Sequence, residues 1–384
     1  MRQFPTNATR RLQTPSIEPM EPRVHLSAVV ARISPLDVVS QTVVIGDGGA
    51  SFASFRDADG TSGRVSVKGA GSMNLSFSGT GLTQTAKGRG VFLAGSGTAL
   101  DSITGGGDTT TTLSIKASGG KRFIDLANFS VGANIKAVDA PGARVIGNFG
   151  FPAGSAGRVV IHGADHASIT VGGERGSANV PLVFKSVSGL FDTILRCDVA
   201  KSVTAAAWTA ETPFGSNLVV SDQIHSLAIA GDLTNFELDV VGGSTQAGKI
   251  TVGGTLTNAY FLLPTGAQSL LAQRMVDSTV SCGVLSLPEG QTLPDSLAQF
   301  SAADSRLGRL SLRGKGETFA GSIIAARKIG ALSLGGVRLD NAGATFGVAA
   351  DTISSLRATD TTTHKKIQAR RLDDPSTWAS ELAA

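Results

Sequence analysis

Short stretches in which apolar residues alternate with small or polar ones recur along most of this chain. Two of them nearly repeat each other, IHSLAIAGDLTN at residues 224–235 and GKITVGGTLTN at residues 248–258. Corresponding residues, such as Leu227 and Ile250, are 23 positions apart. A fixed period between about 20 and 50 residues indicates a repeat architecture, and alternation with period two indicates strands. The pattern therefore predicts the coils of a β-solenoid.

Later stretches continue nearly the same period with a leucine at the same point of each repeat. These anchors are Leu285, Leu310, Leu332 and Leu356. The interval from Ile250 to Leu285 is clearly longer than one period, so we expect an insertion loop between Pro264 and Ser278. About ten coils at a spacing of ~4.8 Å would form a prism on the order of 50 Å long.

An all-β parallel β-helix is the fold class that these repeats predict, and we expect right-handed winding. Inward Val, Ile and Leu side chains would stack into columns, while each strand pairs in parallel with the coils above and below it. Asn235, Asn258 and Asn341 follow GDLT, GGTLT and GVRLD at matching points. Stacked asparagines can bond one another at a bend, so we predict a structural ladder rather than a ligand site.

Four regions follow from the pattern. Residues 1–37 are rich in proline and arginine and lack strand alternation, so we expect a flexible leader. Residues 38–120 contain short strands and tight turns, and they form either a separate β module or capping coils. Residues 121–358 form the solenoid. The basic tail 359–384 is expected to include a short helix, N-capped by Asp374, that covers the last coil.

The composition fits an all-β protein and argues against two classes of partner. Gly accounts for 48 of 384 residues and charged residues for only 17%, against about 25% in an average domain. The net charge is +4, and the basic residues gather near the two ends, where they could contact an anionic envelope polymer. A basic face with interleaved aromatics, typical of nucleic-acid binding, is missing. No apolar run reaches the ~18 residues of a transmembrane helix, so we expect a soluble, monomeric body.

Cys197 and Cys282 are the only cysteines. Two thiols so far apart in the chain do not establish a disulfide framework. Burial as a small hydrophobic side chain is the commoner fate of a free cysteine, and the sequence leaves the state of both thiols open.

The segment MEPRVHLSA near the N-terminus carries a distinctive order of residues. It resembles the LEPR-XLL motif of large, repetitive, exported or surface proteins of environmental bacteria. The matching residues are Glu21, Pro22, Arg23, Leu26, Ser27 and Ala28. Met20 and His25 depart from the motif, which has leucine at both positions. The segment FRDADGTSGRVSVKGAG, residues 55–71, also resembles one that precedes the repeat arrays of this family. The resemblance implies delivery to the cell surface or the extracellular space.

Parallel β-helices include polysaccharide lyases and glycoside hydrolases, so an enzyme of this type is the alternative. Such enzymes gather several carboxylates and a basic residue in one groove. Their sequence motifs do not occur here, but stacked coils can bring distant acids into register. The acids concerned are Asp125, Asp139, Asp165, Asp192, Asp198, Asp222, Asp232 and Asp239. Three carboxylates and one Lys or Arg within about 6 Å of each other in a cleft would favour the enzyme.

The densest group of potential ligands is IHGADH, with His162, Asp165 and His166. Residues four apart in an extended chain are about 13 Å distant, and no fourth ligand is evident. Asp57-x-Asp59-Gly60 is better explained as a hairpin turn than as a calcium loop. The sequence therefore predicts no catalytic, metal-binding or cofactor-binding residues.

These observations together predict a non-catalytic, exported or surface β-solenoid with a structural or adhesive role. It would present a rigid face, rich in Ser and Thr, to extracellular polysaccharide, matrix or surface proteins. A polysaccharide lyase or glycoside hydrolase remains the alternative function.

Overall fold

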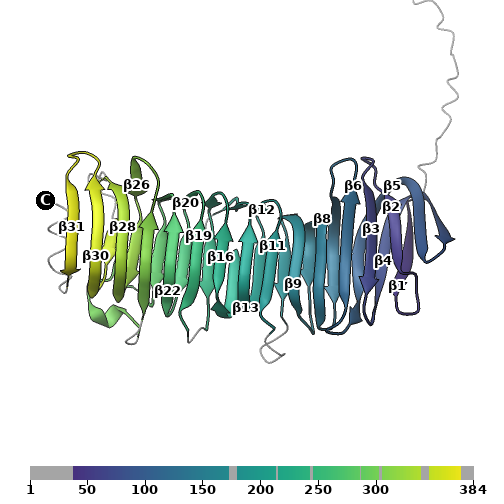
Figure 1. The fold of residues 1–384 in the computed structure, drawn as a ribbon, viewed down its shortest axis with the longest axis horizontal. Helices are drawn as coiled ribbons and strands as arrows, with labels where there is room; N and C mark the ends of the chain where they lie inside the picture. Colours follow the sequence, from purple (N-terminus) through teal and green to yellow (C-terminus); the bar gives the residue numbers. More distant parts are fainter. Residues whose placement is uncertain are drawn as a thin grey trace, which may run out of the picture. The chain divides into compact units, whose positions relative to one another are not determined.

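The computed structural model describes residues 38–372, apart from 173–179, 213–214, 243–244, 286, 302–304 and 339–345. These residues form 31 strands and one short 3-10 helix, η1 (Leu297–Gln299). The strands stack side by side along one axis (Figure 1), which confirms the predicted β-solenoid of the parallel β-helix class. None of the described helices is long and apolar enough to cross a membrane. The leader 1–37 with its export-type motif, Asn341 and Asp374 lie outside the described residues.

The first six strands pair mainly in the antiparallel sense. They are β1 (Val38–Gly46), β2 (Phe52–Arg56), β3 (Ser62–Lys68), β4 (Gly71–Lys87), β5 (Gly90–Gly107) and β6 (Thr112–Ser118). β1 pairs with β4, β4 with β5, β2 with β3 and β3 with β6, all antiparallel. Asp59 and Gly60 lie in the turn between β2 and β3, where Gly60 has a φ of 86°. A positive φ of this kind is what a tight hairpin turn requires.

The following strands form the coils, and they pair with one another only in the parallel sense. They are β7 (Ile124–Val131), β8 (Ile135–Gly150), β9 (Ala156–Asp165), β10 (Ser168–Val171), β11 (Leu182–Ser186), β12 (Leu190–Phe191), β13 (Ile194–Ala205), β14 (Trp208–Thr209), β15 (Leu218–Ile224), β16 (Ser226–Ile229), β17 (Leu233–Thr234), β18 (Glu237–Val240), β19 (Ala247–Val252), β20 (Thr255–Thr257), β21 (Tyr260–Leu263), β22 (Gly266–Ala272), β23 (Arg274–Val276), β24 (Thr279–Cys282), β25 (Arg306–Leu312), β26 (Glu317–Ala320), β27 (Ile323–Ala326), β28 (Lys328–Val337), β29 (Gly347–Ala349) and β30 (Thr352–Asp360). A regular coil contributes three of them, as β19, β20 and β21 do. β5 and β6 pair in parallel with β7 and β8, so the N-terminal strands continue into the coils.

One column of apolar side chains runs through the solenoid and sets the register of its coils. Its members are Leu113, Val138, Val159, Phe184, Val203, Leu227, Ile250, Leu270, Leu310, Leu332 and Leu356. All of them are buried. Full burial of such a side chain contributes about 1.5–3 kcal/mol relative to exposure. Coil stacking therefore supplies the core, because a single coil could not bury its own apolar face.

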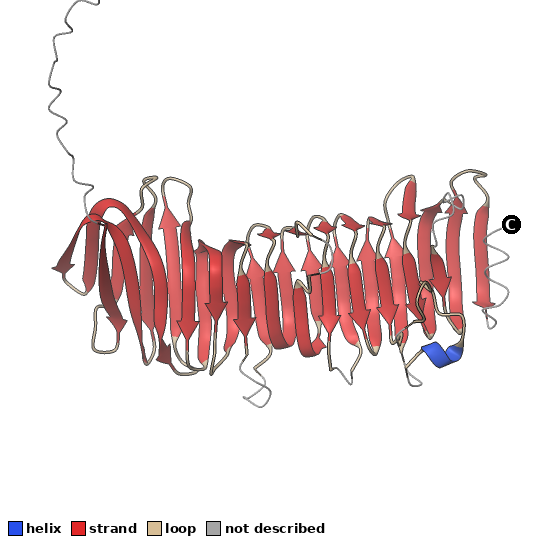
Figure 2. Cartoon of the chain, turned by 180° about the vertical axis from the view of Figure 1, so that it is seen from behind, coloured by secondary structure: helices blue, strands red, loops and turns tan. Residues whose placement is uncertain are grey.

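The insertion lies later in the chain than the sequence predicts. Residues 264–278, where the sequence predicts a loop, contain β22 and β23, and the extra chain instead joins Cys282 to Arg306. This segment carries η1, the blue helix of Figure 2. Leu285 does not join the column, since its exposed fraction is 49%. The string GVLSL imitates the start of a coil, but Pro288 follows it directly and cannot donate a strand hydrogen bond.

An antiparallel strand covers the last coil. β31 (Lys366–Leu372) pairs with β30 in the antiparallel sense, after a turn at Thr361–Thr363. An uncovered strand edge would offer unpaired backbone groups to another chain. The first part of the tail therefore covers the last coil with a strand. The predicted helix lies beyond the described residues.

Candidate functional site

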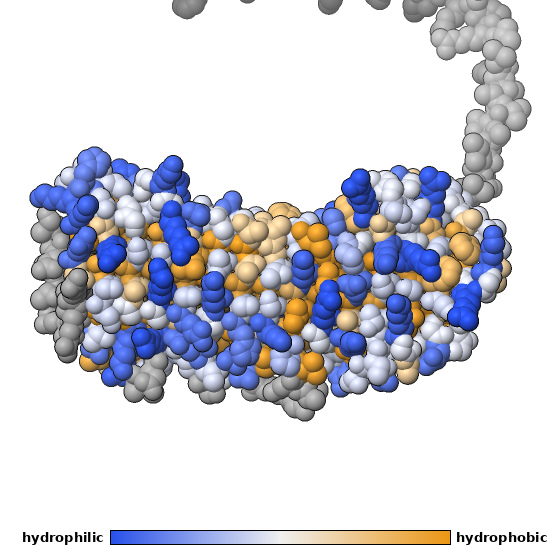
Figure 3. All heavy atoms as spheres, in the orientation of Figure 1, coloured by the Kyte–Doolittle hydropathy of each residue, from blue (hydrophilic) through white to orange (hydrophobic). Residues whose placement is uncertain are grey.

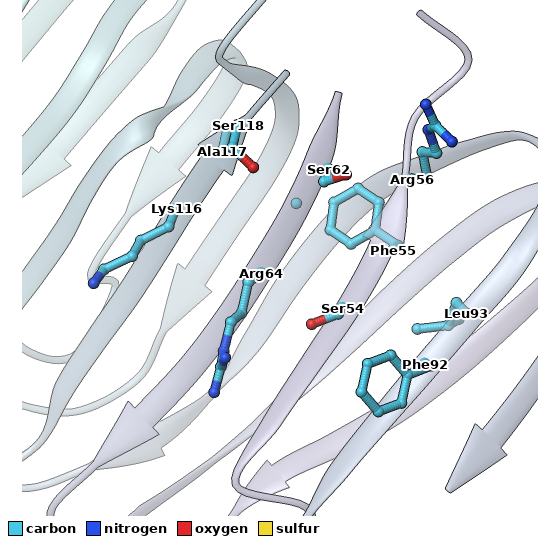
Figure 4. Close-up of a pocket in the computed structure, with 11 residues that line it drawn as sticks. Ser54, Phe55, Arg56, Ser62, Arg64, Phe92, Leu93, Lys116, Ala117 and Ser118 are labelled. Carbon is cyan, nitrogen blue, oxygen red and sulfur yellow. The ribbon is translucent and has the colours of Figure 1, made fainter. Parts of the chain in front are cut away.

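A hollow of about 570 Å³ lies on the outer face of β2, β3, β5 and β6 (Figure 4). We call it the basic hollow. Its polar and aromatic lining consists of Ser54, Phe55, Arg56, Ser62, Arg64, Phe92, Lys116 and Ser118. The hollow therefore combines three cationic side chains with hydroxyl groups and two aromatic rings.

Strand register places the charges of the basic hollow next to one another. Arg64 on β3 lies opposite Lys116 on β6, and both side chains extend from neighbouring strands in Figure 4. On its other side Arg64 lies opposite Ser54, which in turn lies opposite Phe92 on β5. Val65, the next residue after Arg64, is fully buried. Because side chains alternate between the two faces of a strand, Arg64 and the residues opposite it point outward. Register thus builds one row across four strands.

Two like charges opposite each other destabilise a pair of strands. Within the described residues, none of the three cations of the basic hollow has a carboxylate partner at ion-pair distance. The Arg64 guanidinium lies over the Phe52 ring instead, 3.8 Å from its centroid, and the Phe52 and Phe92 rings meet edge to face at 5.8 Å. An anion in the hollow would offset the repulsion between Arg64 and Lys116. Phe92, with an exposed fraction of 40%, offers an apolar surface beside that anion.

A second group of polar side chains lies at one corner of the coils. At this corner several coils carry a residue in the left-handed conformation, with φ between 41° and 51°. These residues are His166, Asp192, Asn235, Asn258 and Asp277. Asn and Asp adopt this conformation more readily than most residues. The Asn258 amide donates to Asn235 Oδ1 at 3.1 Å, and the Asn235 amide donates to the Ala210 carbonyl oxygen at 2.8 Å.

Around His166 the same corner carries charged groups instead of amides. His166 Nδ1 lies 2.7 Å from Asp165 Oδ1. Its other nitrogen, Nε2, lies 3.8 Å from Asp192 Oδ2 and 3.6 Å from Glu211 Oε1. We call these four residues the corner cluster. The hydrogen bond to Asp165 raises the pKa of His166, and the negative charges of Asp165, Asp192 and Glu211 act in the same direction.

Arg144 holds the corner cluster from the preceding coil. Its guanidinium donates to both carboxylate oxygens of Asp125, at 2.7 and 3.0 Å, and its Nη1 lies 3.5 Å from Asp165 Oδ2. The hydrogen bond to Asp125 raises the pKa of Arg144 further above its ordinary value. His162 belongs to a different contact, since its ring stacks on Phe123 with centroids 4.7 Å apart. The two histidines of IHGADH therefore do not share one site.

Three of the eight acids named from the sequence take part in this arrangement, namely Asp125, Asp165 and Asp192. Sequence reasoning missed Arg144 and Glu211. The signal that could have found them is their spacing along the chain. Arg144 lies roughly one coil length before Asp165, and Glu211 lies roughly one coil length after Asp192. Residues separated by one coil length lie at the same point of adjacent coils.

The corner cluster and Arg144 have the composition of three carboxylates and one cation that would favour a carbohydrate-cleaving enzyme. One feature argues against that chemistry. The Arg144 guanidinium already binds both carboxylate oxygens of Asp125 and lies 3.5 Å from Asp165 Oδ2, so the charge of this cation is already offset by two ion pairs.

Comparisons with known proteins assign no family to the chain. No family model matches it, and no curated protein or solved structure matches it significantly. Function therefore has to be inferred from the basic hollow and the corner cluster.

Proposed function

We propose that the chain is an exported, non-catalytic β-solenoid of a bacterial cell surface, and that its basic hollow contacts an acidic polysaccharide of the matrix or envelope. The opposed pair of Arg64 and Lys116 is the observation that carries this proposal. Guanidinium and ammonium groups form strong charge-assisted hydrogen bonds with carboxylate or sulfate oxygens. Serine hydroxyls and the Phe92 ring next to the pair suit the hydroxyl groups and apolar faces of sugar rings.

The solenoid suits a structural or adhesive role because it presents side chains at fixed intervals. On the face seen in Figure 3, hydrophilic and apolar side chains are interspersed along the coils. We expect the protein to act as a monomer, since β31 covers the last coil. Surface delivery is supported by the resemblance of residues 20–28 to the LEPR-XLL motif.

Binding can be tested with the full chain and polygalacturonate, a carboxylated polysaccharide, with neutral dextran as the control ligand. We expect binding to polygalacturonate alone, and weaker binding as salt screens the charges. Exchanging both cations, Arg64→Ser with Lys116→Ser, should weaken binding at least tenfold, because each charge-assisted contact contributes about 1.5–3 kcal/mol. The matched control, Lys185→Ser with Lys249→Ser, removes two exposed lysines of the coils and should leave affinity unchanged. Equal losses in both double variants would contradict the proposal.

Delivery is tested separately by fractionating the source cells. We expect the protein at the cell surface or in the medium. A protein found in the cytoplasm would remove the surface role, whatever the binding assay shows.

Polysaccharide cleavage is the second candidate, and the carboxylates of the corner cluster are the observation in its favour. The same polygalacturonate can be assayed for new reducing ends and for unsaturated products. We expect neither. Product formation that Asp192→Asn abolishes would favour the enzyme over the binding protein.

A further inference from the structure

Three successive coils each contribute one potential metal ligand to the corner cluster. His166 directly follows β9, Asp192 follows β12, and Glu211 comes shortly after β14. β12 pairs in parallel with both β9 and β14, so the three corners lie one above the other. Neighbouring strands are about 4.8 Å apart, a distance that these side chains can bridge.

The three ligand atoms already lie close to the spacing of a coordination shell. His166 Nε2 is 3.8 Å from Asp192 Oδ2 and 3.6 Å from Glu211 Oε1, and all three atoms lie within 4.8 Å of one another. Zinc bonds of about 2.0–2.2 Å in a tetrahedron place two ligand atoms about 3.4 Å apart. Small side-chain rotations would therefore complete the geometry.

The hydrogen bond to Asp165 prepares the imidazole for a cation. When the neutral ring donates Nδ1–H to Asp165, its Nε2 lone pair faces Asp192 and Glu211. Three acceptors then converge with no donor between them, an arrangement that a cation would stabilise. Histidines that bind metals commonly donate their other N–H to a carboxylate in this way. Arg144 holds that carboxylate from the other side, at 3.5 Å.

We propose that the corner cluster binds a divalent first-row transition metal, with Zn²⁺ as the representative ion, through His166 Nε2, Asp192 and Glu211. One nitrogen and two carboxylate oxygens favour this class of ion over Ca²⁺ and Mg²⁺, which prefer oxygen ligands alone. Three protein ligands leave a fourth position for water or another small ligand. The site goes beyond the proposed polysaccharide contact, because it uses none of the residues of the basic hollow.

Calorimetric titration of the untagged full chain with ZnCl₂ tests this inference. We expect one equivalent to bind. His166→Ala and Asp192→Asn should each weaken binding at least tenfold. Asp165→Asn keeps all three ligands but loses the orienting carboxylate, and it should weaken binding about 10–100-fold.

Two control variants remove a histidine and a carboxylate elsewhere, His225→Ala and Asp139→Asn, and both should bind Zn²⁺ like the wild type. Circular dichroism verifies that each variant is folded. As a second readout, Zn²⁺ should raise the thermal midpoint of the wild type but not that of His166→Ala. A wild type without saturable binding overturns the inference, and His166 then acts only as an ion-pair partner of the carboxylates. Binding that survives both His166→Ala and Asp192→Asn overturns it equally.

Discussion

Asn258 illustrates how one backbone angle selects the residue at a coil corner. Its φ of 48° costs most L-residues about 1–2 kcal/mol, and its amide also donates to Asn235. We expect Asn258→Ala to lose about 1–2 kcal/mol of unfolding free energy. Asn258→Gly should lose less, because glycine accepts the angle and only the hydrogen bond is missing. Urea unfolding compares the two variants, and an alanine variant more stable than the glycine variant would contradict the conformational argument.

The two thiols provide a second prediction at the residue scale. Cys197 and Cys282 are buried and free, and burial raises the pKa of each thiol to about 12. Since the thiolate is the reactive form, neither should react with a thiol reagent at pH 8 in the native protein. Two equivalents should react after denaturation. One equivalent that reacts rapidly in the native state would contradict the burial.

Sequence reasoning succeeded at the corners only where residue types repeat. Asn235 and Asn258 are recognisable because two similar stretches carry them at the same point. His166, Asp192 and Asp277 occupy the same corner, but they share only a backbone angle, which local sequence does not reveal. The sequence pointed to Asp165, His166 and Asp192 but did not group them with Glu211, since these residues come from successive coils of unequal length rather than from one motif.

At the scale of the elements, burial distinguishes the strands of the coils from segments that only share their sequence pattern. Leu270 lies in the apolar column and is fully buried, whereas Leu285 is half exposed. We expect Leu270→Ala to cost about 2–5 kcal/mol. Leu285→Ala, the matched control, should stay within about 0.5 kcal/mol of the wild type. Chemical unfolding of both variants tests the register. Equal losses of unfolding free energy in the two variants would show that Leu285 is as deeply packed as Leu270 and would contradict this register.

The turn between β30 and β31 contributes stability that depends on pH. The Asp360 carboxylate accepts hydrogen bonds from the Thr363 hydroxyl and from the backbone N–H groups of Thr362 and Thr363. These bonds lower the pKa of Asp360 below its ordinary 3.8. The stability that they add is therefore complete above about pH 4 and is lost as the pH falls through the lowered pKa.

Asp360→Asn isolates this contribution from those of the other acids. We expect the variant to unfold at a lower urea concentration than the wild type at pH 6. The difference should shrink as the pH approaches 3 and below. A difference that grows on acidification would show that the carboxylate does not support the turn in its ionised form.

At the scale of the whole solenoid, the interior and the ends obey different pairing rules. All described pairs among β7 to β30 are parallel. The antiparallel pairs lie at the ends, four of them among β1 to β6 and one between β30 and β31. The sequence predicted stacked coils because a fixed period of short alternating stretches is typical of repeat architectures. The hairpin signal at Asp59-Gly60 predicted one antiparallel pair, β2 with β3. The sequence could not predict the others, since strand alternation is the same in both kinds of pairing.

Stacking in register is the claim on which the core, the basic hollow and the corner cluster all depend. Thr234 and Thr257 lie opposite each other in adjacent coils, and strands about 4.8 Å apart suit the 4.4–6.8 Å Cα separation of a disulfide. The variant Thr234→Cys with Thr257→Cys should form that bond under mild oxidation, with two fewer free thiols by mass spectrometry and unchanged circular dichroism. The control Thr234→Cys with Lys249→Cys uses the same two coils but different strands, and should stay reduced. A test pair that stays reduced, or a control pair that oxidises as quickly, would contradict the account.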